Sequence, residues 1–443
     1  MSRFAPSPTG LLHIGNARVA LLNQILARQN NQILKLRIDD TDLERSKLEY
    51  IDIIREDLDW LGIKYQYTYK QSERDYSAEI ELLKKENLIY PCYETPEELE
   101  AQRKHQHSQR CPPRYIPCAS DFSRQPHWRF KLTQQNETWT DGVIGEQLHF
   151  AGEYSDPIVI KEDGTLLYNL ASIIDDYRDN TSWILRGQDH VSNTVVQIQM
   201  LRSLDKQRQI QWFHIPLMQE KGQKLSKRIS NEYSIQFLKH QGYDALALIY
   251  TLLNTGKSTP LKISDTVKAI CKSTDTPNAK RDRIIDAIIS DFDFKYSSAR
   301  SEWYIESYKW QLHINQYKSQ LEGIEWLARN GWTDATENHW ELIKDIAGNK
   351  DDVIYWQSVF TDPLFYVKVQ NQNEEIIRKC ALENCDINVI AYKLPQFAKK
   401  EIGQAIHQAL TGKVFGPKIL DLIKVLPSDF IARRLSCDFD SRI

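Results

Sequence analysis

The chain lacks the features that mark membrane, secreted and polybasic proteins. None of its 443 residues lies in an apolar run long enough to cross a bilayer, and we expect no basic-then-apolar leader. Its seven Cys are scattered and form no disulfide framework. The net charge of -3 excludes a chain that is basic throughout, although the 57 Lys and Arg leave room for one basic face. We therefore expect a globular protein of about three domains in a reducing cytoplasm.

The N-terminal stretch predicts a strand, a tight loop and a helix. It reads RFAPSPTGLLHIGN over residues 3–16, and its turn formers from Pro6 to Gly10 allow no helix to begin before His13. From Asn16 onward apolar residues recur at helical spacing. The N-terminus of a helix suits a phosphate, and Gly15 has no Cβ to block the approach of a nucleotide. A capped helix in an ordinary α/β protein would give the same local pattern.

A second parallel strand is predicted over Gln32 to Asp39, which makes residues 1–39 a βαβ unit. The strand ends in Asp39-Asp40-Thr41-Asp42. Carboxylates at the carboxyl end of a parallel strand are well placed for a cation such as an α-amine. Asp40 and Asp42 are equally typical of a solvated turn before the amphipathic helix predicted over Glu49 to Leu61.

Residues 76–157 have the mixed composition of an α+β insertion. We predict an initial helix, a turn through Tyr90-Pro91-Cys92-Tyr93, a capping box of Thr95 and Glu98, and short strands near residues 128–132 and 148–150. Cysteine and histidine also occur here, at Cys92, His105, His107, Cys111 and Cys118. A structural zinc is not expected, because no two of these Cys form a closely spaced pair.

A second nucleotide-fold half is predicted after the insertion. Residues 158–171 should form a hairpin about Asp163-Gly164 that delivers Tyr168 and a helix. A strand over residues 182–185 should end at Arg186, with Ser192-Asn193-Thr194 capping the next helix. Arg186 either clamps a carboxylate or pairs with the acidic residues at 175 and 176.

One more strand, over residues 210–217, precedes a polar loop over residues 219–230. The loop holds four cations, Lys221, Lys224, Lys227 and Arg228, which could fold over a polyphosphate or form a solvated charge run. Helices are predicted from about residue 233. The Trp, Tyr, Lys and Arg between residues 300 and 410 fit a helical module that contacts a polyanion, although an aromatic stripe is more typical of a core.

Several blocks together resemble the class I aminoacyl-tRNA synthetases, and the bacterial glutamyl-tRNA synthetases in particular. The blocks are RFAPSPTG (3–10), HIGN (13–16), RIDDTD (37–42), CYETPEEL (92–99), IIDD (173–176), RGQDH (186–190), KLSKR (224–228) and HQALTG (407–412). The resemblance is dense over residues 1–260, sparse over about 270–400, and returns near residue 405. It implies an α/β Rossmann-like catalytic domain with an α+β insertion, followed by an all-α anticodon-binding region.

The implied domains follow the same order. Residues 1–75 and 158–232 would be the two halves of the catalytic domain, and residues 76–157 the insertion that holds the acceptor end of tRNA. Residues 233–300 would be a helical stem-contact domain, and residues 301–443 the anticodon-binding region. The implied partners are tRNA-Glu, with tRNA-Gln as a second candidate, L-glutamate, and ATP with Mg²⁺, and a monomer is expected.

The resemblance also implies roles for individual residues. The catalytic residues would be His13, Lys224 and Lys227. ATP would be bound by His13, Gly15, Asn16, Lys227 and Arg228, and glutamate by Arg3, Ser7, Asp39, Tyr168, Ser172 and Arg186.

Four residues depart from the family pattern. Asp39 stands where many relatives have Glu, Ser172 where some have Asn, and Gln188 where Glu is common. Glu94 stands where relatives that bind zinc have a Cys.

Four alternatives were weighed. The RIDDTD and APSPTG forms disfavour a glutaminyl-tRNA synthetase. About 190 residues beyond the KLSKR loop disfavour a shorter relative that glutamylates a modified tRNA base, and equally a small-molecule nucleotidyltransferase. A non-catalytic tRNA-binding paralogue is disfavoured by the intact HIGN and KLSKR motifs and favoured by Gln188.

Overall fold

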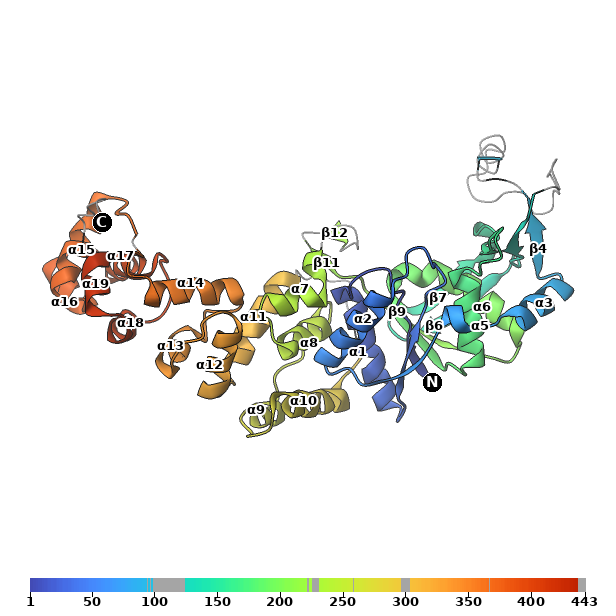
Figure 1. Cartoon of the computed structure of the whole chain (residues 1–443), viewed down its shortest axis with the longest axis horizontal. Coiled ribbons are helices and arrows are strands. Elements are labelled where there is room, and N and C mark those ends of the chain that lie inside the picture. The colour runs from blue at the N-terminus through green and yellow to red at the C-terminus, as the bar shows by residue number, and fades with distance from the viewer. Residues whose placement is uncertain are drawn as a thin grey trace. The chain divides into compact units, whose positions relative to one another are not determined.

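The computed structural model describes residues 1–93, 95, 97–98, 124–220, 223–224, 231–257, 259–295, 303–365 and 367–436 (Figure 1). The backbone alone is described at 219–220, 223–224, 231, 291 and 303–306. The chain forms two compact units. The first comprises Met1–Phe237, Thr251–Lys262 and Thr276–Trp303, and the second Leu238–Tyr250, Ile263–Asp275 and Tyr304–Ile443. Among the described residues, no helix is both long and apolar enough to span a membrane.

The first unit begins with the predicted βαβ arrangement. A parallel three-stranded sheet has the order β1-β2-β3, and helices connect its strands. Its elements are β1 (Ser2–Phe4), α1 (Ile14–Gln29), β2 (Leu34–Ile38), α2 (Leu48–Trp60) and β3 (Tyr65–Lys70). The predicted start of the first helix, after His13, is confirmed. The apolar faces of α1 and α2 are buried, as their 3.6-residue periodicity requires.

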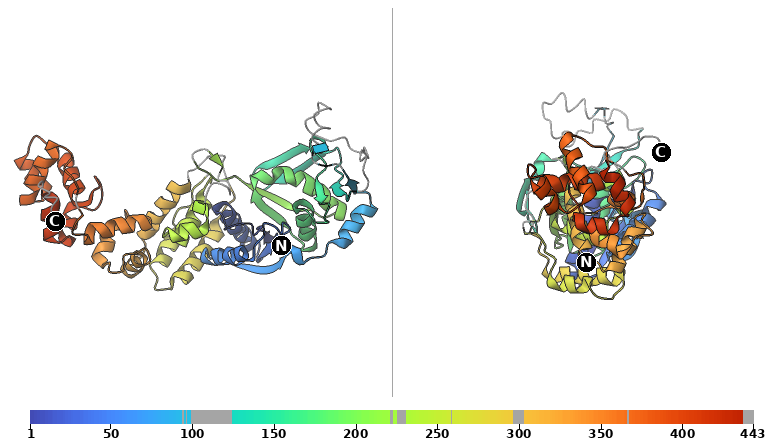
Figure 2. Two further views of the ribbon diagram at one scale, coloured as in Figure 1. Left: turned by 45° about the horizontal axis from the view of Figure 1, so that its top comes forward. Right: turned by 90° about the vertical axis from the view of Figure 1, so that its left-hand side faces the viewer.

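The second half adds two parallel strands beside β1. These are β9 (Trp183–Gly187) and β10 (Gln211–Ile215), and the helices α5 (Tyr168–Arg178) and α6 (Val191–Leu204) lie side by side next to them (Figures 1 and 2). The backbone amide of Ser182 donates to the carbonyl of Met1 at 2.9 Å, so the start of β9 lies against the start of β1. The chain continues from β1 to β2 on one side and from β9 to β10 on the other. Ligands of open α/β sheets bind at such a switch point, beyond the carboxyl ends of the strands.

Residues 77–160 contain two small antiparallel sheets, and the sequence predicted these elements only in part. One sheet has the order β4-β5-β8, and the other is the hairpin β6-β7. With α3 (Ser77–Lys85), the elements are β4 (Ile89–Cys92), β5 (His127–Phe130), β6 (Asn136–Asp141), β7 (Gly145–Phe150) and β8 (Ile158–Ile160). The predicted turn at residues 90–93 is wrong, because residues 90–92 belong to β4. Pro91 is tolerated there since β4 is an edge strand.

Three further local predictions have clear outcomes. The capping box is confirmed, since the Thr95 amide donates to Glu98 at 2.8 Å and the Glu98 amide donates to the Thr95 hydroxyl at 3.2 Å. The hairpin about Gly164 is confirmed, with a positive φ of 85° at that glycine. The predicted cap at residues 192–194 is wrong, because α6 already begins at Val191 and these residues form its first turn.

Residues 219–220 and 223–224 of the predicted loop over residues 219–230 form a hairpin. Strands β11 (Gln219–Glu220) and β12 (Gln223–Lys224) pair antiparallel, so the prediction of a loop is wrong for these residues. The side chain of Lys224 and all of Lys221, Lys227 and Arg228 lie outside the described part.

From residue 235 onward every regular element in the described part is helical. The helices are α7 (Ile235–His240), α8 (Ala245–Asn254), α9 (Asp265–Cys271), α10 (Pro277–Asp291), α11 (Trp303–Asn315), α12 (Gln320–Arg329), α13 (Glu337–Ile343), α14 (Lys350–Thr361), α15 (Gln372–Glu383), α16 (Ile387–Lys393), α17 (Lys399–Thr411), α18 (Ile419–Val425) and α19 (Ser428–Leu435). Four tryptophans, at positions 326, 332, 340 and 356, are at most 1% exposed and lie in one hydrophobic core. The core interpretation of the aromatic stripe is confirmed for these four.

Two helical glycines of the second unit give opposite predictions for stability. A Cβ on Gly323 would lie 2.2 Å from the ring of the buried Trp340, whereas a Cβ on Gly403 would meet Ile387 at 3.4 Å, an ordinary contact. We expect Gly323→Ala to lower the free energy of unfolding by about 1–3 kcal/mol, because the added methyl group overpacks the core. Gly403→Ala should be neutral or add up to about 1 kcal/mol, since alanine favours the helix. Thermal melts of the two variants would test this, and equal melting temperatures would contradict the packing described here.

Candidate active site

The HIGN motif forms the N-terminus of α1. His13 is the N-cap, and its Nδ1 accepts a hydrogen bond from the Gly15 amide at 3.1 Å. That bond places the proton of a neutral His13 on Nε2. The first turn of α1 contains no acidic residue, so nothing on the helix itself opposes an anion. A Cβ on Gly15 would contact only the His13 ring, at 3.4 Å or more, so packing does not require glycine at this position.

The segment after KLSKR lies against HIGN. His13 forms an antiparallel bridge with Ser234, and the Ile235 amide donates to the Leu12 carbonyl at 2.9 Å. The rings of His13 and Tyr233 are 5.9 Å apart. The fold therefore brings residues 233–235, which follow the second signature in the sequence, to the first signature, although more than 200 residues separate the two.

A buried charge cluster lies where β1 and β2 meet α5. Arg3 donates through Nε and Nη2 to the two oxygens of Asp176, each at 3.0 Å. Arg37 donates to Asp39 at 2.8 Å and to Asp176 at 2.9 Å. All four side chains are at least nine-tenths buried. Arg3 and Arg37 thus both bind Asp176, and Arg37 also binds Asp39.

The charges of this cluster shift the pKa values of its carboxyl groups in opposite directions. Burial opposes ionisation of Asp176, but Arg3 and Arg37 outweigh it and lower its pKa to about 2. Burial raises the pKa of Asp39, and the Arg37 guanidinium only partly opposes this. Burial likewise raises the pKa of the neighbouring Asp175. Asp176 is therefore the firmly ionised member of the cluster.

Asp39 is held by two side chains. Besides Arg37, the Ser172 hydroxyl donates to its Oδ2 at 3.1 Å. The Asp39 amide donates to the Pro6 carbonyl at 3.0 Å, which places the turn-rich N-terminal loop next to this carboxylate. Ser7, the next residue of that loop, is exposed. The structure thus brings Arg3, Asp39 and Ser172 into one network and leaves Ser7 beside it.

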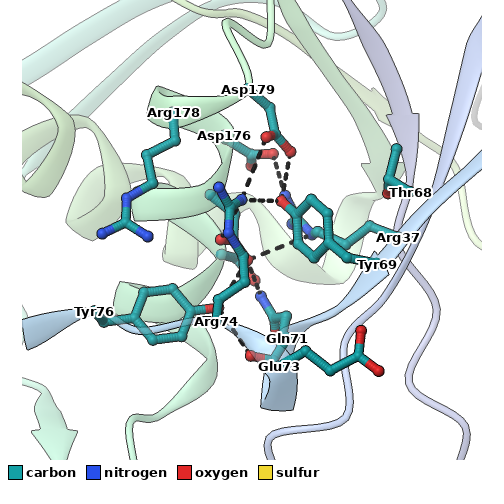
Figure 3. A network of polar contacts seen from close by, with 12 residues as sticks. Arg37, Thr68, Tyr69, Gln71, Glu73, Arg74, Tyr76, Asp176, Arg178 and Asp179 are labelled. Atoms are coloured by element: carbon teal, nitrogen blue, oxygen red, sulfur yellow. Dashed lines mark hydrogen bonds and ion pairs between the residues drawn. The ribbon is translucent and has the colours of Figure 1, made fainter.

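The charge cluster continues through Asp175 to Gln71, Arg74 and Tyr76, which Figure 3 labels. Asp175 accepts hydrogen bonds from Gln71 at 2.8 Å, from Arg74 at 3.0 Å and from the Tyr76 hydroxyl at 3.1 Å. Arg74 also pairs with Asp179 and lies over the ring of Tyr69. The 3₁₀ helix η1 (Gln71–Glu73) and the residues beside it are thereby fixed to α5.

Arg186, at the end of β9, is a buried cation with neutral partners. It donates from Nε to His214 at 3.2 Å, from Nη1 to Gln197 at 2.7 Å, and from Nη2 to Thr194 at 2.5 Å. Within the described ranges it forms no ion pair, so neither acidic residue proposed as its partner fills that role. Burial lowers its pKa, an effect only partly opposed by the Tyr168 hydroxyl.

Tyr168 links the two arginines predicted to bind glutamate. It is the first residue of α5, and its hydroxyl interacts electrostatically with both Arg186 and Arg3. The Arg3 charge also acts to lower the pKa of Arg186. Arg3, Asp39 and Ser172 therefore belong to one hydrogen-bonded network, and Tyr168 and Arg186 interact electrostatically with Arg3.

Sequence reasoning missed the residues that hold these side chains. Arg37 could have been predicted from the sequence. It is a charged residue in the mostly apolar run LKLRI, and, two positions before Asp39, it lies on the same face of the strand as that residue. His214 and its partner Asp141 carried none, since 73 residues separate them and both sit in ordinary strand patterns.

Comparison with known proteins now identifies the family. The family model of class I tRNA synthetases (E and Q), catalytic domain, matches residues 1–285. The chain belongs to this family. The glutamate–tRNA ligase 1 of Rickettsia bellii (strain OSU 85-389) is 34% identical over 98% of the chain and 99% of that protein. The glutamate–tRNA ligase 2 of Bartonella henselae is 32% identical over 98% of each.

Solved structures of family members share the fold. A glutamate tRNA ligase from Elizabethkingia meningosepticum, in complex with its amino acid, superposes with a TM-score of 0.70 at 19% identity, over 98% of this chain and 97% of that one. A glutamate-tRNA synthetase from Elizabethkingia anophelis gives a TM-score of 0.71 at 19% identity, over 98% of both chains. The predicted class I catalytic fold with a helical C-terminal region is confirmed.

No metal centre emerges from the described residues. They contain no group of three or more His, Cys, Asp and Glu arranged to hold an ion. Cys92 is buried in β4, while the other residues considered for zinc lie outside the described part. We therefore assign no metal ligands.

Proposed function

We propose that the chain is a glutamate–tRNA ligase. In the first step the carboxylate of glutamate attacks the α-phosphorus of ATP and expels pyrophosphate. In the second, a terminal hydroxyl of the tRNA attacks the glutamyl adenylate and releases AMP. Both steps depend mainly on positioning of the reactants and on neutralisation of charge. The curated relatives that support this proposal are named for the same activity and match nearly the full chain.

The observation that carries the choice of amino acid is the buried Arg186. A cation that is 5% exposed and whose hydrogen bonds, among the described residues, go only to neutral groups gains most from an anionic ligand. Arg3 lies close by, and its own charge is already shared with Asp176. A carboxylate on the substrate side chain would complete the charge balance, whereas the neutral amide of glutamine would not. Tyr168, which interacts electrostatically with both arginines, is assigned a hydrogen bond to glutamate.

The amine of glutamate is assigned to Asp39. Oδ1 of that carboxylate accepts from Nε of Arg37, and Oδ2 accepts from the Ser172 hydroxyl and, at 3.5 Å, from Nη2 of Arg37, so the amine would use the remaining lone pair of Oδ1. The short Asp39 side chain is thus held in a fixed position and not extended toward the substrate. Ser7 is assigned a hydrogen bond to glutamate from the adjoining loop.

ATP is assigned to the N-terminus of α1 and the KLSKR loop. His13, Gly15 and Asn16 would contact the nucleotide from the helix, and Lys224, Lys227 and Arg228 from the loop. The absence of acidic residues in the first turn of α1 and the uncrowded position of Gly15 fit this role. Mg²⁺ would accompany ATP and neutralise part of its phosphate charge.

The nucleic-acid partner is assigned from the family and the helical region. The insertion would take the acceptor end of the tRNA, residues 233–300 its stem, and residues 301–443 its anticodon. We further propose that the chain acts as a monomer in the cytoplasm. Divergence over residues 270–400 motivates a second candidate substrate, tRNA-Gln charged with glutamate.

Side-by-side charging assays would test the tRNA assignment. Purified tRNA-Glu and tRNA-Gln would each be incubated with the chain, ATP and radiolabelled glutamate. We expect tRNA-Glu to be charged, and charging of tRNA-Gln would extend the substrate range. If neither tRNA is charged while both bind, the non-catalytic paralogue replaces this proposal.

Gly15→Ala should separate folding from ATP binding. The added Cβ would make only ordinary contacts and alanine favours the helix, so the melting temperature should stay equal or rise. The same methyl group would stand where ATP must approach, so the KM for ATP should rise on the order of tenfold to a hundredfold. Gly403→Ala is the control for added helix propensity. An unchanged KM for ATP would move the nucleotide away from Gly15.

A further inference from the structure

Three buried groups from separate strands form a hydrogen-bonded chain that ends at Arg186. Asp141 closes β6 and contacts Nδ1 of His214, on β10, at 2.6 Å. Nε2 of His214 lies 3.2 Å from Nε of Arg186, on β9. His214 is fully buried, and Asp141 and Arg186 are at most 5% exposed. Neither Asp141 nor His214 is among the residues that the proposed function uses.

The chemistry of Asp141 fixes the direction of these hydrogen bonds. Its Oδ1 accepts from the backbone amides of Val143, Ile144 and His214, at 3.0 to 3.2 Å. Its Oδ2 can only accept, so the proton of a neutral His214 must be on Nδ1. Nε2 faces the Nε–H of Arg186, which can only donate, so the ring carries one proton and is neutral. Burial also lowers the pKa of His214, although Asp141 opposes this. Nε2 is then left with a lone pair that faces Arg186.

That lone pair holds the Nε edge of the Arg186 guanidinium. The opposite nitrogens are held by Gln197 and Thr194, and the plane lies 5.0 Å from the centre of the Trp212 ring. The Thr194 hydroxyl, 3.0 Å from Nε2 of His214, can donate to the His190 carbonyl instead, which leaves Nε2 for Arg186. Other charges near the ring are Arg186 itself and Asp189. The tautomer of His214 therefore determines whether Arg186 meets an acceptor or a second donor.

Asp141 lies beside His214 because the β6-β7 hairpin packs against β10. The Gly142 amide donates to the Trp212 carbonyl at 2.8 Å, and a Cβ on Gly142 would lie 2.1 Å from the Phe213 ring. We propose that Asp141 and His214 are positioning residues, which orient Arg186 for the substrate carboxylate through the Nδ1–H tautomer of His214. This rests on the proposed function, in which Arg186 binds glutamate.

Asp141→Asn is the direct test in the full-length chain. The three backbone amides would keep the carbonyl oxygen of the new side chain on their side and turn its NH₂ group toward His214. Nδ1 must then accept, and the proton moves to Nε2, against the Nε–H of Arg186. We expect the KM for glutamate to rise ~10- to 100-fold, as for a lost hydrogen bond to a charged group. The KM for ATP should stay within about twofold.

The control is Glu146→Gln, the same charge change on an exposed residue of the same hairpin. It should change neither KM. If Asp141→Asn fails to fold, His214→Asn replaces it. Asparagine keeps a donor for Asp141 but is too short to place an acceptor at the position of Nε2, so the same rise in the KM for glutamate is expected. An unchanged KM for glutamate in the variant that folds would overturn the proposal.

The ¹⁵N chemical shifts of histidine-labelled wild type give an independent readout of the tautomer. We expect His214 to be protonated on Nδ1, and an Nε2–H tautomer would overturn the proposal without any variant. Failure of the proposed function is distinguishable, because wild type would then not charge tRNA with glutamate at all. A wild type that charges tRNA, with Asp141→Asn equal to it, removes only the positioning role.

Discussion

Replacing Arg186 with methionine is expected to lower kcat/KM for glutamate by about 10²- to 10⁴-fold, the range measured when one partner of a buried charge pair is removed. The residue is 5% exposed, and its donors reach only neutral groups within the described part of the chain. Its charge is therefore available to the substrate. The loss should appear in ATP–pyrophosphate exchange with tRNA present and in aminoacylation.

Stability should not fall with activity in this variant. A buried cation without a carboxylate partner costs free energy in the apo protein, and methionine fills a similar volume without that cost. We therefore expect an equal or higher melting temperature for Arg186→Met. The matched control is Arg55→Met on the exposed face of α2, which should change neither quantity. A kcat/KM within tenfold of wild type would make Arg186 a structural residue.

Asp176→Asn should have the opposite signature, with a large loss of stability. Asp176 pairs with both Arg3 and Arg37, and a neutral amide in its place would leave these two buried cations without the negative charge of that carboxylate. Breaking a buried pair in this way costs about 3–5 kcal/mol. The first unit should melt about 5–15 °C lower. Arg3 would also lose its bidentate anchor, so the KM for glutamate should rise.

Asp52→Asn, an exposed change on α2, is the control for this experiment and should leave the melting temperature unchanged. Because the chain has two compact units, the melt should be followed in each of them separately. If Asp176→Asn melts within about 1 °C of wild type, the buried cluster contributes little to folding.

The pKa of Asp176 predicts how the difference in stability between wild type and Asp176→Asn depends on pH. Its folded value of about 2 lies below the ordinary 3.8, so its contribution is fully present above pH 3.8 and is lost as the pH falls toward 2. The gap in stability between wild type and Asp176→Asn should therefore narrow by about 2 kcal/mol over this window. Asp39 and Asp175, whose pKa values are raised, are present in both proteins, so their protonation contributes to both stabilities and not to the gap. A gap that stays constant to pH 2 would contradict the assignment.

The parts of the fold that local chemistry determines could be predicted from the sequence. The turn formers before His13 and the apolar periodicity after it predict the strand-loop-helix unit, and β2 follows from its apolar run. The prediction failed at β4, because Pro91 reads as a turn unless the strand is known to lie at a sheet edge. Strand β6 was missed, because its pairing with β7 and its contact with β10 are tertiary.

The same limit applies to the site. The carboxyl-end rule predicts that Asp39 and Arg186 lie at the same edge of the sheet, since each follows or ends a predicted strand, whereas the role of Arg3 was predicted only from the family resemblance. It does not show what holds them. The hydrogen-bonding partners of Arg186 come from α6 and β10. Thr194, which was predicted to be part of a helix cap, accepts a hydrogen bond from Arg186 instead. The short Asp39 is likewise explained by Arg37 and Ser172, which hold it from two sides.

The central claim is that this chain esterifies glutamate to tRNA at the expense of ATP. The most direct measurement incubates wild type with purified tRNA-Glu and either labelled glutamate or labelled glutamine, with and without ATP, and counts the amino acid bound to tRNA. We predict ATP-dependent incorporation of glutamate and none of glutamine, because Arg186 requires a carboxylate. Incorporation of glutamine in preference to glutamate, or of neither amino acid, would contradict this account.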